Sequence, residues 1–140
     1  MFLGFTGTHR PRLDDKGRLF LPAKFRDQLS GGVVLTKGQE GCLRLYPAHE
    51  FVRQGDLVAA DQSTREARNA VRVFFAGASD QVPDKQGRIT VPAELRAYAG
   101  LDKDVAVLGL HSCMEVWDLA SWEAEEAARD DAFRGGGAGA

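Results

Sequence analysis

One segment of the chain occurs twice, and this repetition constrains the fold more than any other feature of the sequence. Residues 14–26, DDKGRLFLPAKFR, return as residues 84–96, DKQGRITVPAELR, so that six residues recur in register at an offset of 70. Further along the offset becomes 71, because Cys42 matches Cys113 and Tyr46 matches Trp117. Internal repetition decides an architecture before any local pattern does. We therefore expect two similar modules in tandem.

The length of the chain indicates that the two modules depend on each other. The chain has 140 residues, 44% of them hydrophobic, which is enough for one ordinary domain. Half of that length is too short to bury a full core alone. We expect the modules to pack on each other as a pseudo-dimer. No run of about 18 apolar residues or signal peptide is apparent, which favours a cytoplasmic protein.

The net charge of -2 hides two poles of opposite sign. Residues 1–26 carry six cationic and two anionic side chains, a net charge of +4, whereas residues 118–131 carry one cationic and six anionic side chains, a net charge of -5. A nearly neutral chain is not expected to coat nucleic acid indiscriminately. A local basic pole is typical of a surface that binds a polyanion, with a merely solvated charged end as the alternative.

The first half of each repeat predicts a β-hairpin and a short helix. In the first copy a strand ends at residues 12–14, a turn covers residues 15–17 and a strand returns over residues 18–21. The turn glycines supply a positive φ, and the aspartates accept hydrogen bonds from nearby backbone or from the arginine four residues on. Proline as the first helical residue and glycine beyond the end bound the helices, which run from Pro22 to about Leu29 and from Pro92 to about Ala99.

A second hairpin and a helical stretch complete each repeat. The hairpins are predicted at residues 33–46 and 105–117, two helices within residues 47–75, and a last helix from Leu119 to about Arg129 anchored by Trp122. The two cysteines occupy equivalent places among apolar residues, so we expect small core residues rather than a disulfide or a metal pair. Residues 135–140 are Gly and Ala only and are expected to be a disordered tail.

Two copies of a strand, an Asp-x-x-Gly-Arg turn, a returning strand, a Pro-Ala helix and a second hairpin resemble the SpoVT/AbrB swapped-hairpin fold. With the opening Met1-Phe2-Leu3-Gly4 and the segment 13–26, the chain is similar over about residues 1–124 to the MraZ family of bacterial transcriptional regulators. The resemblance implies an α+β, mainly β fold: a tandem-repeat, AbrB-like β-barrel pseudo-dimer with peripheral helices. The expected division is residues 8–50 for the first SpoVT-AbrB repeat, 51–78 for a helical connector, 79–122 for the second repeat, 123–134 for the end of the C-terminal helix and 135–140 for the tail.

The same resemblance implies a function. Members of the family are repressors that bind direct repeats upstream of the division and cell-wall gene cluster containing their own gene, and they associate with the nucleoid. The partners implied for this chain are double-stranded operator DNA and further copies of itself in a ring of about eight to twelve protomers. No cofactor, metal, membrane or small-molecule substrate is implied.

The chemistry of the turns favours binding of DNA. Arginine makes bidentate bonds to guanine edges or to phosphate, and lysine acts as a point charge. The predicted DNA-binding residues are Arg18 and Arg88, then Lys16, Arg12 and Lys85. The residues predicted to form the turns and orient the arginines are Asp14, Gly17, Asp84 and Gly87. A purely structural ion pair with Asp14 is the alternative for Arg18, and the two roles are compatible.

Two departures from the family pattern and one further basic cluster qualify this assignment. Three extra residues lie around Phe5-Thr6-Gly7, and the lysine of the second turn sits one position earlier than that of the first. A separate group of arginines is expected to lie on a solvated helix face, with DNA contact as the alternative: Arg65, Arg68 and Arg72.

Other functional classes receive little support. The chain has three scattered histidines, no cysteine-histidine spacing typical of a metal site, and no phosphate-binding loop or dinucleotide fingerprint, so we expect no enzyme activity. The alternative of another class is an antitoxin-like protein-interaction module, which the same fold also serves. Antitoxins of this fold usually add a partly hydrophobic tail that wraps the toxin, whereas here a second module and a Gly/Ala tail follow.

Overall fold

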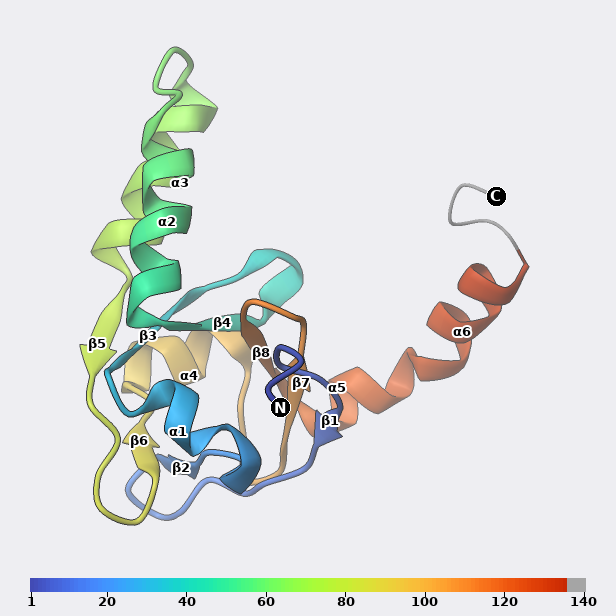
Figure 1. Cartoon of the computed structure of the whole chain (residues 1–140). Coiled ribbons are helices and arrows are strands. Elements are labelled where there is room, and N and C mark those ends of the chain that lie inside the picture. The colour runs from blue at the N-terminus through green and yellow to red at the C-terminus, as the bar shows by residue number, and fades with distance from the viewer. Residues whose placement is uncertain (136–140) are drawn as a thin grey trace.

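The computed structural model describes residues 1–135, so the predicted tail lies outside the described residues apart from Gly135. The centre is a six-stranded antiparallel sheet with the order β1-β7-β8-β4-β3-β5, accompanied by a two-stranded ribbon of β2 and β6 (Figure 1). The fold thus mixes helices with antiparallel sheet, as expected. The strands are β1 (Thr8–His9), β2 (Arg18–Phe20), β3 (Val33–Lys37), β4 (Leu43–Pro47), β5 (Ser79–Gln81), β6 (Arg88–Thr90), β7 (Val105–Gly109) and β8 (Met114–Asp118).

Each repeat contributes one central hairpin, and both hairpins were predicted. β3 pairs with β4, β7 pairs with β8, and the two hairpins join through β4 and β8, where Leu43 faces Val116. The short strands at the sheet edges come from the opposite repeat. β1 of the first repeat pairs with β7, and β5 of the second repeat pairs with β3. The sheet therefore interleaves strands of the two repeats.

The ribbon also joins the repeats. β2 and β6 pair with each other in the antiparallel sense, with Leu19 opposite Ile89 at the centre. Two reciprocal backbone bonds extend this pairing: the Leu21 N–H donates to the Gly87 carbonyl at 2.9 Å, and the Val91 N–H donates to the Gly17 carbonyl at 2.8 Å. Each turn is thus hydrogen-bonded to the residue that precedes the proline of the other repeat.

The predicted closed barrel is not observed. Among residues 1–135 the six-stranded sheet stays open at β1 and β5, and the ribbon forms a separate sheet. The ribbon strands have three residues each, and each ends before a proline, which cannot donate a ladder hydrogen bond. β2 is connected to the segment that precedes the turn by an isolated β-bridge between Leu13 and Leu19.

An apolar cluster lies between the ribbon, the sheet and the short helices, and it draws residues from both repeats. Leu19 and Ile89 point into it from the ribbon and are 0% and 2% exposed. Phe5, from the stretch with extra residues, is also buried there and bonds through its backbone to His111. The predicted core positions of the cysteines are confirmed, since Cys42 and Cys113 are buried and free.

The helices mostly begin and end where the sequence indicates. They are the 3₁₀ turns η1 (Ala23–Phe25) and η2 (Gln39–Gly41) and the helices α1 (Arg26–Leu29), α2 (Ala48–Ala59), α3 (Arg65–Ala76), α4 (Ala93–Ala99), α5 (Leu119–Ala124) and α6 (Glu126–Arg134). Thr64 caps α3 by accepting a bond from the Ala67 N–H, and Gly100 ends α4 in the left-handed conformation. Pro22 and Pro92 were predicted as the first helical residues, but each stands at the N-cap, one position earlier.

The last helix differs from the prediction. Instead of one helix to about Arg129, the chain forms α5 and α6 with a break at Glu125, whose φ is -110° and ψ is 6°. The break leaves the Trp122 carbonyl without its regular helical donor, and the Arg129 side chain donates to it at 2.7 Å. The same guanidinium lies 3.4 Å from the Trp122 ring centroid. This local contact replaces the helical bond, and no glycine or proline marks it in the sequence.

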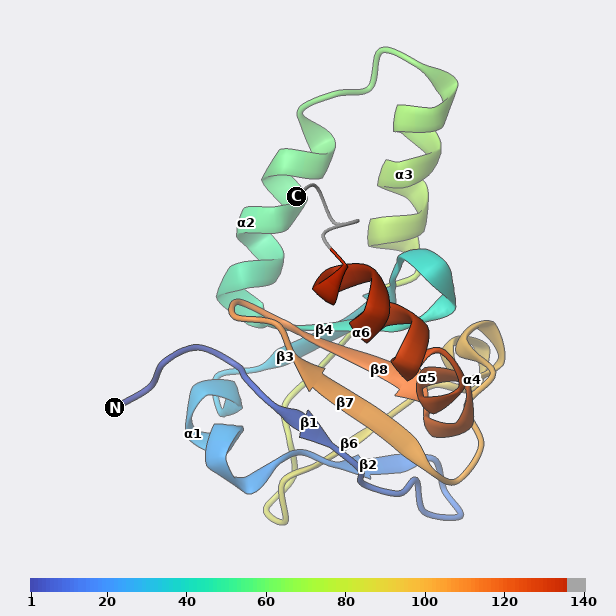
Figure 2. The same ribbon diagram turned by 90° about the vertical axis from the view of Figure 1, so that its right-hand side faces the viewer.

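Two helical projections extend from the sheet. The hairpin of α2 and α3 stands on one side of it, and the two views agree that the ribbon of β2 and β6 lies at the opposite end of the molecule (Figures 1 and 2). The second projection, α5 followed by α6, carries the acidic segment away from the sheet (Figure 1). No helix within residues 1–135 combines the length and apolar character needed to cross a membrane.

Candidate nucleic-acid interface

The two repeated turns have the same hydrogen-bond geometry. Asp14 accepts bonds at 2.9 Å from the backbone N–H groups of Lys16 and Arg18, and its second oxygen accepts from the Arg18 Nε at 2.6 Å. The second turn repeats this arrangement, with distances of 2.9 Å to the two backbone groups and 2.7 Å to the Nε of Arg88. Each aspartate therefore shapes its turn and holds the root of an arginine side chain.

These contacts keep both carboxylates ionised. The pKa of Asp14 lies below its ordinary value of 3.8, chiefly because the Arg18 backbone N–H donates to the carboxylate, with the guanidinium adding to the effect against partial desolvation. The pKa of Asp84 is lowered for the same reasons by Arg88. Hydrogen bonds to the charged form stabilise it. At neutral pH each turn therefore contains a carboxylate and an arginine of fixed geometry.

The arginines keep the ends of their guanidinium groups free. The bonds to Asp14 and Asp84 use Nε, and among residues 1–135 no hydrogen-bond partner is present for the Nη atoms of Arg18 or Arg88. Their side chains are only partly exposed, 31% for Arg18 and 21% for Arg88. An arginine held at its root and free at its end is pre-organised for a bidentate contact with an acceptor outside the protein.

The predicted cations differ in their surroundings. Lys16 and Lys85 are exposed at the tips of the two turns. The equivalent of Lys16 in the second turn is Gln86, whose backbone N–H takes the same bond to the aspartate. Arg12 lies outside the turn and pairs with Asp104 of the other repeat at 2.9 Å. Arg12 is therefore partly neutralised, whereas the two lysines add charge at the turns.

Two arginines of the repeated motif, which the sequence reasoning did not assign to the site, support the turns from the opposite repeat. Gly17 and Gly87 have φ of +74° and +77°, as the turn requires. A Cβ built on Gly17 would lie 2.8 Å from Cζ of Arg96, and one built on Gly87 would lie 2.8 Å from Cζ of Arg26. Each guanidinium is thus packed on the turn of the other repeat. The sequence did contain a signal that could have identified these two residues, because Arg26 recurs as Arg96 at the offset of 70.

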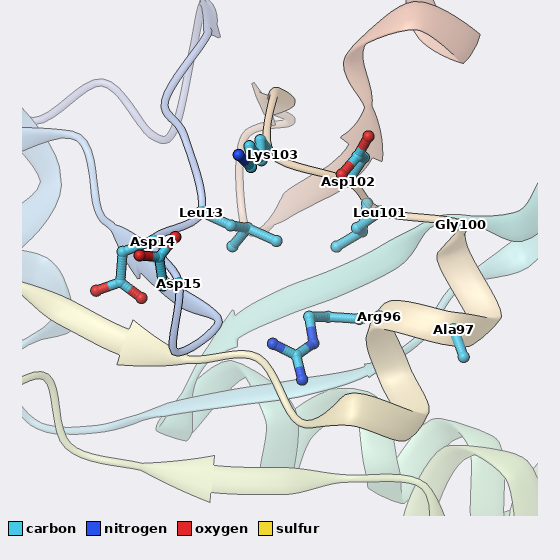
Figure 3. Close-up of a pocket in the computed structure, with 9 residues that line it drawn as sticks. All are labelled: Leu13, Asp14, Asp15, Arg96, Ala97, Gly100, Leu101, Asp102 and Lys103. Carbon is cyan, nitrogen blue, oxygen red and sulfur yellow. The ribbon is translucent and has the colours of Figure 1, made fainter.

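A cavity of about 570 Å³ lies behind the first turn. Figure 3 shows Asp14 and Asp15 on one side of it and the Arg96 side chain extending toward them from α4. Asp102 and Lys103 complete a lining of both charge signs. The lining is therefore suited to positioning the turn and offers no concentration of one charge for a small ion.

The outer face of the ribbon presents four side chains. Because side chains alternate along a strand, Leu19 and Ile89 point inward and their neighbours point outward. Arg18 lies opposite Thr90, and Phe20 lies opposite Arg88. The two predicted arginines are thus brought together on one exposed surface, which we call the ribbon face: Arg18, Phe20, Arg88 and Thr90.

The arginines of α3 lie far from the ribbon face. α3 belongs to the projecting hairpin at the other end of the molecule (Figure 1). Arg68 donates to the Gln62 carbonyl at 3.1 Å and Arg72 to the Asn69 side chain at 2.8 Å, both in exposed positions. These local bonds agree with a solvated helix face. Within residues 1–135 no cluster of three or more His, Cys, Asp or Glu side chains is arranged to hold a metal.

Comparison with known proteins gives a consistent result. The family model described as "MraZ protein, putative antitoxin-like" matches twice, over residues 4–73 and 74–134. A protein of Salinispora arenicola named Transcriptional regulator MraZ is 58% identical over 130 residues, which cover 92% of each chain. Proteins of the same name from Thermobifida fusca and Kocuria rhizophila are 53% and 55% identical, covering 92% of this chain and 91% of theirs. Both repeats are matched, and the similarity extends over nearly the whole length. The chain therefore belongs to the MraZ family.

Proposed function

We propose that this protein is a transcriptional regulator that binds double-stranded DNA through the ribbon face and the two turns beside it. The observation that carries the proposal is the pair of arginines, Arg18 and Arg88, each held at Nε by an aspartate and free at Nη on one exposed face. The names of the relatives supply the regulatory role.

The geometry suits a groove of DNA. The major groove admits a two-stranded β-ribbon, and arginine is the commonest side chain that reads guanine there. In this proposal Lys16 and Lys85, exposed at the tips of the turns, neutralise phosphates of the DNA backbone. Asp14 and Asp84 each accept a bond from the Nε of an arginine, so their charge is compensated within the protein.

A single protomer offers only a few cations for contacts with DNA phosphates, which favours the assembly of several protomers on one operator. Two or three cations at a turn give non-specific dissociation constants of roughly 10⁻⁴ to 10⁻⁶ M. Linking several binding units on one operator adds about 10² to 10⁴ in apparent affinity. We propose a ring of about eight to twelve protomers on an operator of direct repeats, repressing the division and cell-wall gene cluster that contains its own gene. The acidic residues of α5 and α6 and the basic residues 1–26 offer complementary charge for contacts between copies.

We also propose the finer architecture and setting. The pairing of β1 with β7 and of β5 with β3 supports a swapped-hairpin pseudo-dimer. Repeats at residues 8–50 and 79–122, a connector at 51–78 and a terminal segment at 123–134 fit this description. The protein would act without enzyme activity, in the cytoplasm and on the nucleoid.

Footprinting of the purified protein on the DNA upstream of its own gene tests the function. We expect protection of regularly spaced short repeats. Arg18→Ala and Arg88→Ala should abolish the footprint while leaving the mass of the assembly in light scattering unchanged. Arg134→Ala is the matched control, because Arg134 also pairs with an aspartate, Asp131 at 3.0 Å, but lies on α6. Undiminished binding by Arg18→Ala, with the wild-type salt dependence, would exclude the turns and direct attention to the α3 arginines.

Toxin neutralisation is the second candidate, which the words "antitoxin-like" in the family description favour. It predicts a stoichiometric complex with another protein. If the purified chain bound no upstream DNA but co-purified at fixed stoichiometry with the product of a neighbouring gene, this candidate would replace the first.

A further inference from the structure

The ribbon face contains one large apolar side chain that no fold requirement explains. Phe20 is 43% exposed on the outer face, whereas its neighbours in sequence, Leu19 and Leu21, are 0% and 2% exposed in the core. The Arg88 guanidinium lies 5.8 Å from the Phe20 ring centroid, across the strand pair. The Phe20 ring therefore lies beside a cation on the candidate binding surface and is exposed enough to contact a ligand there.

Phe20 also breaks the internal symmetry of the ribbon. The pairing of Leu19 with Ile89 relates the two strands, so that Arg18 corresponds to Arg88 and Phe20 corresponds to Thr90. The arginines are the same in both repeats, but the other outward position carries a bulky aromatic ring in one and a small hydroxyl side chain in the other. Two related strands that differ at one outward position will not read a perfectly symmetric site.

The charge around Phe20 favours a polyanion over a second copy of this face. Arg18 and Arg88 share the ribbon face, and Lys16 is exposed at the adjacent turn. Two such faces brought together would place these cations against each other, which is unfavourable. DNA compensates the cations and also offers an apolar group in its major groove, the C5 methyl of thymine, which phenylalanine contacts.

We propose that Phe20 is a specificity-determining residue that packs against the C5 methyl of a thymine adjacent to the guanine read by Arg88. This inference rests on the proposed function. Cross-strand neighbours have Cβ atoms about 4.5–5.5 Å apart, while successive base pairs are separated by about 3.4 Å. Phe20 and Arg88 therefore reach the same or neighbouring base pairs. The smaller Thr90 makes a weaker contact in the other half of the site, and this difference gives each bound element a direction.

Removal of single methyl groups from the DNA tests the inference. Each thymine of the footprinted duplex is replaced in turn by deoxyuridine, and dissociation constants are measured for the wild type, Phe20→Ala and Phe20→Leu. In the wild type we expect one thymine per element, next to a guanine, whose replacement weakens binding by about fourfold, the value of one buried methyl group. Phe20→Ala should bind more weakly and lose sensitivity at that thymine alone, whereas Phe20→Leu should retain most of it. Phe133→Ala is the control, because Phe133 is 80% exposed on α6.

The outcomes separate the two proposals. A Phe20→Ala variant with the wild-type deoxyuridine profile would overturn this inference and leave the proposed function intact. A lower assembly mass for Phe20→Ala, with an unchanged profile, would reassign Phe20 to contacts between copies and would also overturn it. Failure of the wild type to bind any upstream duplex would overturn the proposed function and this inference together.

Discussion

The contact between the turn of one repeat and an arginine of the other makes a specific prediction for Gly17→Ala. Gly17 has a φ of +74°, and its added Cβ would lie 2.8 Å from Cζ of Arg96 and 3.3 Å from the Val91 carbonyl oxygen. The backbone conformation alone costs a non-glycine residue about 1–2 kcal/mol. Forcing extra volume into an occupied site typically costs about 1–3 kcal/mol, and here we expect about 1–2 kcal/mol because the crowding atoms belong to the end of the Arg96 side chain. We expect the free energy of unfolding to fall by about 2–4 kcal/mol.

Two other glycines separate these contributions. Gly100 has a φ of +60° with nothing within 4 Å of an added Cβ, so Gly100→Ala should show the backbone cost alone, about 1–2 kcal/mol. Gly31 has neither a positive φ nor a near neighbour, and Gly31→Ala should change stability by no more than about 0.5 kcal/mol. The double variant Gly17→Ala/Arg96→Ala should lose less than the sum of its single variants, by about 1 kcal/mol, because the crowding has been removed.

Urea denaturation at a fixed protein concentration measures all of these variants. With a slope of about 2 kcal/mol per molar urea, a loss of 2–4 kcal/mol moves the midpoint by about 1–2 M. The reasoning would be refuted if Gly17→Ala were no less stable than Gly100→Ala and the double variant were simply additive. Arg96 would then not be packed on the turn.

Three further predictions address the core, the turns and the dependence of the halves. Leu19→Ala should lower the free energy of unfolding by about 2–5 kcal/mol, since Leu19 is 0% exposed, whereas the control Leu57→Ala, at a position 60% exposed, should have little effect in the same urea titration. The pKa values of Asp14 and Asp84 are lower in the folded than in the unfolded chain. The stability that these carboxylates contribute to the fold is therefore present above about pH 3.8, and it is lost as the pH falls through their pKa values in the folded chain. A variant with both aspartates changed to asparagine should therefore lose less stability in acid, and equal acid sensitivity would contradict the assignment. A fragment of residues 1–76 lacks the partners of β1 and β2 and should give no cooperative thermal transition; a melt like that of the full chain would count against mutual dependence.

The central hairpins and most helix bounds were predicted well from local patterns, whereas the hairpin predicted at residues 12–21 was wrong: it is reduced to an isolated bridge, and β2 pairs with β6 instead. Proline before each short helix and glycine after it placed α1 and α4 to within a few residues, because these residues act on their own backbone. The bonds from Arg18 to Asp14 and from Arg88 to Asp84 were also foreseen, since the partners are four residues apart in the chain. The functional roles of these residues stay predictions.

Features that depend on distant partners were not foreseen in detail. β1 pairs with β7 and β5 pairs with β3, but the sequences of these strands do not indicate which strand each will pair with. β1 and β5 have only two and three residues, too few to show the alternation of apolar and polar side chains that predicts a strand. The packing of Arg96 on Gly17 links positions far apart in the chain, so repetition marked the arginine without revealing its contact. The break at Glu125 is accompanied by a hydrogen bond from the Arg129 side chain to the Trp122 carbonyl, and no helix-ending residue such as glycine or proline indicates it in the sequence. In each case the decisive contact is tertiary.

The pairing of Leu19 with Ile89 has a consequence for the order in which the protein forms. Its two residues are 70 positions apart, whereas β3 with β4 and β7 with β8 are neighbours in the chain. Closing a long loop costs more entropy than closing a short one, and distant contacts form slowly. We expect the two central hairpins to form early and the ribbon to form after them. A nascent chain that has not reached Thr90 has no ribbon face, so the DNA-binding surface that we propose would exist only once both copies of the repeat have been synthesised.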